Sequence, residues 1–477
     1  MNADPATRDS EQSERTGWLD LVRGGRGVFT VLLNLAVIVH GVNTFVLSTV
    51  MPSVIADIGG AAYYAWPAMV YLIGTIVGAS GGAPVRAALG RRHGYVASGL
   101  VFVAGSAVAA LAPSMAILLA GQLLQGFGGG LLLSQSMALV REIYHGALRG
   151  RALAVINAAW VAAAMIGPAE AGFFAAIDWW RGAFWAAIPV AALVCALAWR
   201  YVAASGDPGR RSGFPLRRLA LIAAAVMCVA AAGQIDSVPA GIALVIASCL
   251  LVRFTLGLDA RSDNPIYPRR ALSPFADIGA AYWMFMMLAF TQVAPAIFLP
   301  LLLGVLHDVP MLWLGYYNML MSIAWSVGSL AVAHVTHRGT TRWAILAGFA
   351  ISTIGLAGMA AGVAEHPLWL LAIWSIVIGL GIGVSNVLAI TWTMSIAARG
   401  EESLAASAIP ALRSLGLAFG AAATGLIANA AGLGDATDPG NVTRALTAVF
   451  AFCALAPAVG LAMTVLSFAA NARRVSG

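Results

Sequence analysis

The sequence contains no lysine and little charge of either sign. All 27 basic residues are arginine, only 20 residues are acidic, and charged residues make up 10% of the 477 positions, whereas hydrophobic residues make up 60%. A soluble domain is closer to one quarter charged and one half apolar. Because this apolar excess cannot be hidden in one water-exposed core, the chain is predicted to use lipid as its solvent, with the bilayer as a partner.

Cysteine is scarce, and no two cysteines form a C-x-x-C pair. The four cysteines lie inside apolar runs, which argues against a disulfide framework or a zinc site and predicts small buried residues: Cys195, Cys228, Cys249 and Cys453. No H-E-x-x-H or carboxylate-rich motif is present, so neither a metal nor a cofactor is expected. The net charge of +7 is spread over short loops, and nucleic acid is therefore not expected as a partner.

Long apolar runs recur along the chain, each with roughly the 20 residues that cross the hydrocarbon of a bilayer. They lack the strict alternation of barrel strands and are predicted to be helices. Fourteen runs are predicted in a six, two, six order: 29–51, 61–82, 95–113, 115–138, 152–175 and 182–203; 216–234 and 237–256; 279–304, 309–333, 342–362, 367–393, 406–430 and 443–469.

This order predicts an all-α membrane protein made of two six-helix bundles and an inserted helix pair. The bundles are expected at 29–203 and 276–470, with the pair and its linkers at 204–275. Residues 1–28 form a predicted cytoplasmic segment, and residues 471–477 form a cytoplasmic tail. No loop is long enough for a separate catalytic domain, so the function is expected to lie among the helices.

Arginine placement predicts the orientation. If residues 1–28 lie in the cytoplasm and the runs alternate, all of the 27 arginines except Arg181, Arg413 and Arg444 fall in or beside cytoplasmic segments. Short cytoplasmic loops are enriched in basic residues. The first apolar run is also too long for a signal peptide. The chain is therefore predicted to be a multi-pass protein of the inner (plasma) membrane with both termini in the cytoplasm.

A series of short motifs follows these runs in order. They lie at 43–52, 89–92, 122–130, 167–172, 180–184 and 413–420. In this order they resemble the major facilitator superfamily, in particular its fourteen-helix drug:proton antiporters, over residues 29–470. The resemblance implies the major facilitator fold and a monomeric secondary transporter that exports amphipathic small molecules by alternating access, with protons as the coupling ion.

The resemblance also identifies residues with expected roles in conformational change, and it marks departures from the family pattern. The conformational residues are Gly90, Arg91, Arg92, Gly126, Gly130, Gly167, Pro168 and Arg413. Asn43 and Ala87 stand where the family usually has acidic residues, and Gln122 stands where it usually has arginine. These neutral residues argue against proton coupling by the usual route.

Several glycines have a second interpretation that needs no motif. Small residues four apart let helices approach closely in lipid, and this spacing occurs at Gly126 and Gly130, Gly379 and Gly383, and Gly416 and Gly420. Gly167-Pro168 is also interpreted as softening its helix, so that two bundles can rock against each other.

Ionisable residues inside the predicted runs are candidates for coupling. A carboxylate in a membrane is costly and can avoid part of that cost by binding a proton, so Glu170 is the predicted titrating group, with an interfacial structural role as the alternative. His40 is a candidate proton relay or a simple hydrogen-bond partner of a neighbouring helix. Arg413 is expected to snorkel or to bind a backbone carbonyl. Substrate-cavity candidates are Asn43, Gln122, Gln125, Gln292, Asn386 and Trp392.

Alternative functions remain open. A facilitator or a non-transporting sensor of the same fold is compatible with the missing charges. An intramembrane serine protease is a rival from another class, because Gly78-Ala79-Ser80-Gly81 matches G-x-S-G and His334 is available as a base. The transporter is preferred over this enzyme because the helix number and motif order fit it better.

Overall fold

A computed structural model describes residues 18–144, 147–204, 216–235, 237–262, 273–332, 335, 337–363, 365–396, 402–433 and 438–476. Every regular element in these residues is helical. The first group is η1 (Trp18–Leu21), α2 (Arg26–Ile58), η2 (Ala61–Tyr63), α3 (Trp66–Ala110), α4 (Met115–Ile143), α5 (Ala147–Ala176) and α6 (Arg181–Tyr201).

The second half begins with α7 (Leu216–Ala232) and α8 (Val238–Ala260), which form a helix pair. The last group is α9 (Asp277–Thr291), α10 (Val293–Leu301), η3 (Leu302–Leu306), α11 (Met311–Ala331), α12 (Arg338–Ala361), α13 (Leu368–Ile396), α14 (Glu402–Ala430) and α15 (Pro439–Ser476). The predicted all-helical class is confirmed.

Eleven stretches of the described helices are long and apolar enough to cross a bilayer. They coincide with eleven of the fourteen predicted runs, and the other three runs fall on α7, α11 and α14. α7 has only 17 residues, and the part of α11 that is described without a gap, Met319–Ala331, is shorter than a span. The multi-pass membrane class is supported, whereas the count of fourteen stays a prediction.

Two helix boundaries differ from the predicted ones for reasons of backbone geometry. α2 continues past residue 51 through Pro52 to Ile58, and it ends at Gly59, whose φ of 70° is left-handed. Pro52 does not end the helix, because neighbouring helices compensate for lost backbone hydrogen bonds in membranes. Conversely, Gly90 has φ 77° and ψ 175°, and it turns the chain between the runs predicted at 61–82 and 95–113, most of which lie in α3.

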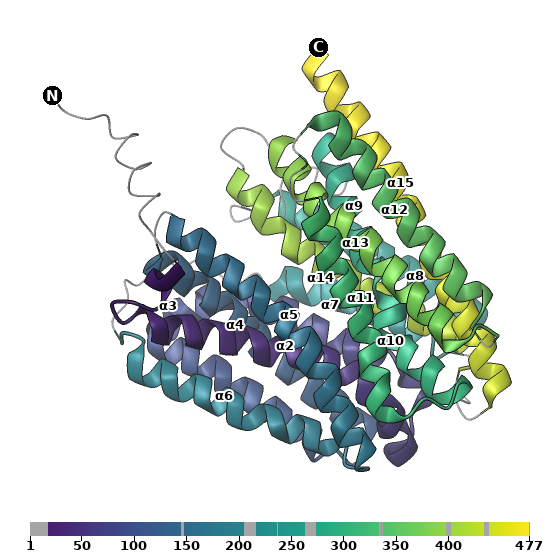
Figure 1. The fold of residues 1–477 in the computed structure, drawn as a ribbon, viewed down its shortest axis with the longest axis horizontal. Helices are drawn as coiled ribbons and strands as arrows, with labels where there is room; N and C mark the ends of the chain where they lie inside the picture. Colours follow the sequence, from purple (N-terminus) through teal and green to yellow (C-terminus); the bar gives the residue numbers. More distant parts are fainter. Residues whose placement is uncertain are drawn as a thin grey trace.

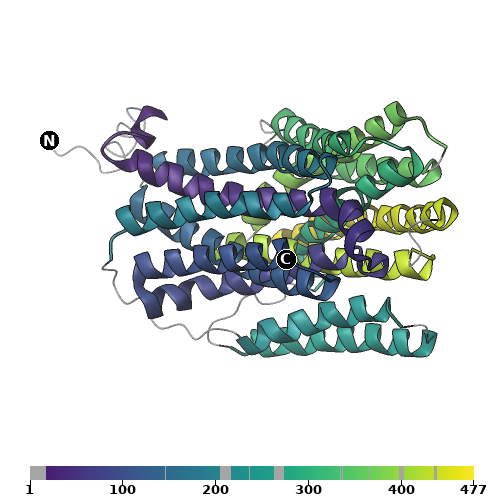
Figure 2. The same ribbon diagram turned by 90° about the horizontal axis from the view of Figure 1, so that it is seen from below.

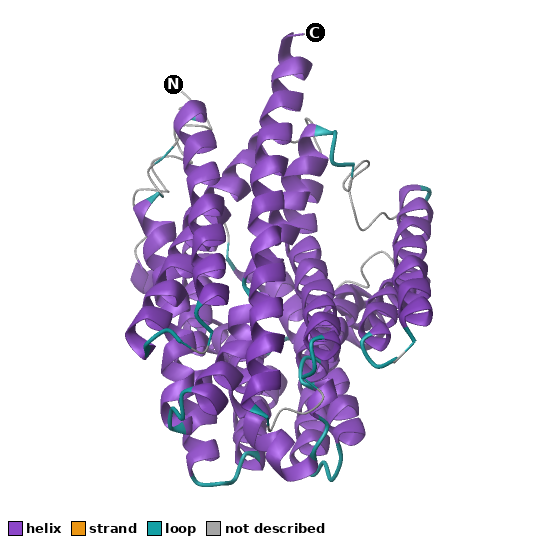
Figure 3. Cartoon of the chain, turned by 90° about the vertical axis from the view of Figure 1, so that its right-hand side faces the viewer, coloured by secondary structure: helices purple, strands orange, loops and turns teal. Residues whose placement is uncertain are grey.

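The helices form two groups that meet at one end. Figure 1 shows α2–α6 on the left and α9–α15 on the right, arranged as a V whose arms converge. The arms diverge toward the end where α2 begins and α15 ends, which we name the terminal end. Figure 3 shows the long last helix extending past its neighbours at that end. We name the opposite end, which carries Gly59–Ala65, the distal end. The two groups therefore converge only near the distal end.

The apolar core follows the same division. One cluster runs through α9–α15 and continues into the distal halves of α2, α3 and α6, where Val50, Tyr64 and Phe184 belong to it. A second cluster fills the terminal halves of α2–α6, with members such as Leu32 and Val194, and within the described residues it has no member from α9–α15. The terminal half of the first group thus has a core of its own.

The pair α7–α8 lies beside the main body. Figure 2 shows these two helices as a separate layer at the lower edge of the molecule. α7 packs against α14, α3 and α8. A Cβ atom on Gly233, at the turn of this pair, would lie 2.8 Å from the Cα of Leu426, so the turn is fitted against α14. The pair is thus attached mainly through α7 and its turn.

The cysteines are all free, and one of them corrects the prediction of burial. Cys195 and Cys453 are buried, Cys228 is half-buried, and Cys249 is exposed. Cys249 lies on α8, whose membrane-crossing stretch Pro239–Asp259 is only 11% buried. The prediction was wrong for Cys249 because an apolar helix at the edge of a membrane protein faces lipid rather than a core.

Glycines four residues apart bring helices into close contact. A Cβ atom on Gly126 or Gly130 would lie 2.1 Å from Tyr71 O or 2.2 Å from Thr75 O of α3. In the second group, a Cβ on Gly379 or Gly383 would lie 2.2 Å from Met321 O or 2.1 Å from Trp325 O of α11. These distances support the packing interpretation and show that glycine pairs allow close helix contact in both groups.

Candidate functional site

His40 lies in a buried aromatic cluster between helices. Its ring is 4% exposed, and its Nδ1 is 2.7 Å from the Tyr71 hydroxyl of α3. Tyr71 stacks on the ring with centroids 5.4 Å apart, and Trp160 of α5 meets it edge-on. A Cβ on Gly129 would lie 2.4 Å from Nδ1, so glycine is needed beside this ring. The geometry favours the hydrogen-bonded structural role over a relay.

Glu170 lies on α5, which packs against α2 and α11. The side chain is half-buried, and it makes no ion pair within the described part of the chain. Seven residues earlier, Ala163 packs on Gly41 of α2, whereas Ile166 and Phe173, four before and three after Glu170, are exposed. Helical periodicity therefore places Glu170 at the border between the packed face and the exposed face of α5.

Gly167 and Pro168 precede Glu170 and set the fit of α5 against α2. A Cβ on Gly167 would lie 2.8 Å from Phe45 Cβ and 2.9 Å from Val42 O. Pro168 is inside the helix, where it supplies no backbone N–H. The local backbone next to Glu170 thus combines close packing with a missing hydrogen bond, a combination that permits bending.

Three predicted cavity residues of the first group are buried and incompletely paired. The amide N of Asn43 has no hydrogen-bond partner among the described residues, and neither polar atom of Gln122 has one. Gln125 donates to Ser106 Oγ at 2.7 Å, and its side-chain oxygen has no hydrogen-bond partner among the described residues. Buried polar atoms normally have partners. These three side chains therefore carry unpaired polar atoms inside the first helix group, and their contact with a substrate stays a prediction.

The predicted cavity residues of the second group do not behave alike. Gln292 is half-buried at the break between α9 and α10, and Asn386 is half-buried on α13. Trp392 donates from Nε1 to Ser467 Oγ at 2.9 Å and stacks on Phe468 with centroids 3.7 Å apart. These contacts tie α13 to α15, so for Trp392 the geometry favours packing over substrate contact.

Arg413 of α14 is placed differently from the expectation. Its guanidinium lies over the Trp325 ring of α11, 4.6 Å from the ring centroid. A cation over an aromatic face is attracted by the ring quadrupole, and the attraction is stronger away from water. The side chain thus binds an aromatic ring where snorkelling or a carbonyl contact was expected.

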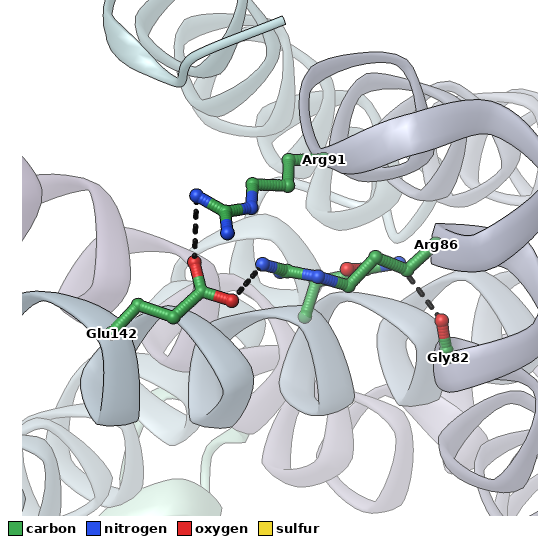
Figure 4. Close-up of polar contacts among 5 residues, drawn as sticks. Gly82, Arg86, Arg91 and Glu142 are labelled. Atoms are coloured by element: carbon green, nitrogen blue, oxygen red, sulfur yellow. Dashed lines mark hydrogen bonds and ion pairs between the residues drawn. The ribbon is translucent and has the colours of Figure 1, made fainter. Parts of the chain in front are cut away.

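The turn at Gly90 carries an ion-pair cluster that includes a residue missed in the sequence. Glu142, near the end of α4, pairs with Arg86 and also with Arg91, at 3.4 Å, as Figure 4 shows. Arg92 instead donates from Nε to Val202 O at 2.8 Å. Glu142 is thus an acidic partner of this motif although position 87 is alanine. The sequence signal that could have identified Glu142 is an acidic residue next to arginines that are predicted to lie in the cytoplasm.

A second polar cluster fixes the distal end of the first group. Asp57 accepts hydrogen bonds from Arg181 and from Trp180 Nε1, the latter at 3.1 Å, and Arg181 also donates to Ala112 O at 3.0 Å. Asp57 lies near the end of α2, beyond the apolar run predicted at 29–51. Arg181 and then Trp180 hold the pKa of Asp57 below its ordinary value, so its charge is kept near neutral pH.

The distal end also joins the two groups and the helix pair, a junction that the motifs did not predict. Asn429 of α14 donates to Ala62 O at 2.7 Å and to Gly233 O at 3.1 Å, and Gln234 donates to Ala62 O at 2.8 Å. Tyr64 stacks on Phe298 with centroids 5.4 Å apart. We name these five residues and Gly233 the distal junction.

The serine-protease alternative gains no support. Ser80 donates to Ile76 O of its own helix at 3.0 Å. His334 lies outside the described residues. Nucleophilic catalysis needs a serine held by a base, and the described hydrogen bond of Ser80 is instead the ordinary one of a helical serine.

Comparisons with known proteins agree with this arrangement. The family model described as Major Facilitator Superfamily matches residues 33–421. A protein of Mycobacterium tuberculosis named as a probable multidrug-efflux transporter is 30% identical over 453 residues, covering 92% of this chain and 95% of that protein. The multidrug transporter protein MdtP of Bacillus subtilis is 29% identical over 186 residues, covering 39% of this chain and 32% of that protein.

Solved structures show the same fold at lower identity. A peptide transporter matches with a TM-score of 0.65 and 16% identity over 94% of this chain and 95% of that chain. A D-xylose–proton symporter matches with a TM-score of 0.59 and 14% identity over 90% of this chain and 96% of that chain. At these identities the likeness concerns the fold alone.

Proposed function

Because the chain belongs to the Major Facilitator Superfamily and is a membrane transporter, we propose that it exports amphipathic small molecules in exchange for protons. The observation that carries the proposal is the similarity, over 92% of this chain, to a protein named as a probable multidrug-efflux transporter. An apolar composition with few fixed charges suits amphipathic substrates, because sugars and phosphates need several fixed polar or basic partners. The buried unpaired amides of Asn43, Gln122 and Gln125 supply a small polar complement.

Alternating access is the proposed mechanism, with the two helix groups as rocking bodies. The bodies are 29–203 and 276–470, and the pair within 204–275 moves with one of them. Two features support this division: the separate core of the terminal half of the first group, and the junction at the distal end. Each protein molecule works as a monomer in this proposal.

The terminal end is proposed to face the cytoplasm, in the inner membrane. Arg86, Arg91 and Arg92 lie on the turn at that end, and short basic turns favour the cytoplasmic side. With this orientation the described conformation is closed toward the outside, and its arms diverge toward the cytoplasm. Such a state receives a substrate from the cytoplasm or the inner leaflet, as an exporter requires.

Glu170 is the proposed coupling group. It is a half-buried acid without an ion-pair partner among the described residues, and it follows the Gly167-Pro168 step at which α5 is able to bend. Proton binding removes the cost of a carboxylate in lipid and so couples protonation to the position of α5. His40 is the weaker candidate, because Tyr71 already occupies its Nδ1.

The test is efflux of cationic and neutral dyes from cells that lack their own pumps, with and without a protonophore. Protonophore-sensitive efflux is expected. Glu170→Gln is expected to slow it about tenfold or more, the change that 1.4 kcal/mol produces. Glu365→Gln makes the same chemical change at an exposed distal residue and is the control. Wild-type rates and pH dependence in Glu170→Gln would exclude Glu170 as the coupling group.

A facilitator is the second candidate, favoured by the neutral residues Asn43, Ala87 and Gln122. It predicts dye efflux that does not respond to the protonophore. A sensor without transport predicts no efflux difference for any substrate. The same dye panel therefore separates the three functions.

A further inference from the structure

A groove runs along the outside of the second helix group, between α8 and the faces of α9 and α14. Its volume is about 1160 Å³. Trp283, Met286 and Phe290 of α9 and Phe419 of α14 form an apolar wall. α8 reaches the rest of the protein chiefly by packing on α7, and its membrane-crossing stretch is only 11% buried. The groove therefore separates an outlying membrane helix from the helix group.

The α8 side of this groove has a regular pattern. Cys249, Arg253, Gly257 and Arg261 follow one another every four residues and line the groove. This spacing sets Cys249, Arg253 and Gly257 on one face of α8, and Arg261 follows as the C-cap residue of the helix. A Cβ atom on Gly257 would have nothing within 4 Å. Two arginines, about 12 Å apart along the helix axis, thus flank an open notch.

The charges of these two arginines have no counter-charge among the described residues. Arg253 and Arg261 are exposed, and neither makes an ion pair or hydrogen bond within the described part of the chain. The nearby acid Asp259 is engaged by Arg218 of α7. The described lining of the groove contains no acidic residue. Arg253 also lies inside the membrane-crossing stretch Pro239–Asp259, where an isolated charge is costly.

We propose that this groove binds one anionic phospholipid from the leaflet at the terminal end. The acyl chains lie against the aromatic and methionine wall, and the phosphate lies at the Gly257 notch between Arg253 and Arg261. Long arginine side chains reach toward the headgroup level from within a span. Basic pockets between membrane helices on the cytoplasmic side bind anionic headgroups in this way. The lipid fills the space between α8 and the α9–α14 wall.

A phospholipid suits this site better than a soluble anion. The apolar wall needs an apolar ligand, and the α8 stretch that flanks the groove is long and apolar enough to cross a bilayer. The charge, in turn, selects among lipids. A neutral headgroup would leave both guanidinium groups unbalanced, whereas one phosphate with a net negative headgroup satisfies them together.

Lipid retention is measured on the purified full chain by native mass spectrometry after equilibration with phosphatidylglycerol and phosphatidylcholine of identical acyl chains. The wild type is expected to retain one phosphatidylglycerol with a preference of about thirtyfold, which two arginines at the headgroup level supply. Arg253→Gln combined with Arg261→Gln is expected to bring the two lipids near parity. Arg200→Gln removes a charge at the terminal end of α6 and is expected to keep the preference.

A second variant tests the location without changing any charge. Gly257→Leu fits the open space at the notch, so it is expected to lower phosphatidylglycerol retention at least tenfold in a folded, monodisperse protein. Equal retention of both lipids by the wild type, or an unchanged preference in the double arginine variant, would overturn the proposal. The measurement needs no transport, so its result is independent of the proposed export function.

Discussion

The two ends of the molecule are held together in different ways. At the distal end, Asn429 and Gln234 bind Ala62 O, and Tyr64 stacks on Phe298, so that both helix groups and the α7–α8 pair meet. At the terminal end, the described ion pairs of Glu142 with Arg86 and Arg91 stay inside the first group. The distal contacts join bodies, whereas the terminal contacts stiffen one body.

This difference indicates which contacts a conformational change must break. Each hydrogen bond of the distal junction contributes about 1 kcal/mol net. These hydrogen bonds are therefore weak enough to break during a conformational change and strong enough to favour the state in which the two groups are joined. The core of the terminal half of the first group has no described member from α9–α15 and stays in place when the junction opens, whereas the cluster shared by the two groups must part at the distal end. The terminal contacts, in contrast, need not change when the groups move as rigid bodies.

Locking the distal junction is expected to have the largest effect. Tyr64→Cys with Phe298→Cys, in a chain whose four native cysteines are replaced, should be joined by a bifunctional thiol reagent that replaces the two stacked rings, because these side chains face each other in the junction. Dye efflux should then stop almost completely and return when a reducible linker is cleaved. Thiol labelling and efflux are measured on the same membranes.

The matched control joins two residues of one group. Thr30 and Tyr144 meet with their oxygens 2.7 Å apart at the terminal end of the first group. Thr30→Cys with Tyr144→Cys should accept the same linker and keep efflux. Equal inhibition by both linkers would mean that the two ends do not differ in the proposed way.

Weakening the junction is expected to have an intermediate effect. Asn429→Ala removes the donor to Ala62 O and Gly233 O, a loss of about 1–2 kcal/mol that changes an equilibrium roughly 5- to 30-fold. A thiol at Ala65→Cys, buried in the junction, should then be labelled faster by that factor. Rates of maleimide reaction measure this directly.

Asn34→Ala is the control for that substitution. Asn34 donates to Thr30 O within α2 at 2.7 Å, so its loss affects one helix of one group. The labelling rate at Ala65→Cys should stay at the wild-type value. A comparable rise in both variants would show general loosening instead of an opening of the distal junction.

The features of this comparison differ in how far the sequence predicts them. The helical class and the close helix approach at Gly126 and Gly130 can be predicted from the sequence, because hydropathy and four-residue spacing are local signals. The pairing of Glu142 with Arg86 cannot be predicted in this way, because 56 residues separate the two and nothing in either segment specifies the other. Asn429 and Ala62 are 367 residues apart, so their contact in the distal junction is even less predictable from the sequence.

The candidate site shows the same limit. His40 and Trp392 were singled out as polar or aromatic groups within apolar runs, but their roles depend on partners from other helices. Tyr71 forms a hydrogen bond with His40. Trp392 donates a hydrogen bond to Ser467 and stacks on Phe468. Periodicity places a residue on a face, whereas the neighbour across that face comes from tertiary packing. For Glu170, the structure shows a half-buried acid without an ion-pair partner among the described residues, and its role as the titrating group stays a prediction.

Removing the terminal ion pairs is expected to have the smallest effect. Glu142→Gln takes away the acceptor charge for Arg86 and Arg91, and because these side chains are partly exposed, the loss is about 0.2–1 kcal/mol of unfolding free energy. The melting temperature in detergent should fall slightly. Labelling at Ala65→Cys should not change, because no described contact of Glu142 crosses between the helix groups. If Glu142→Gln instead speeds labelling as much as Asn429→Ala does, the ion pairs set the position of the arms, and the two ends form one coupled switch.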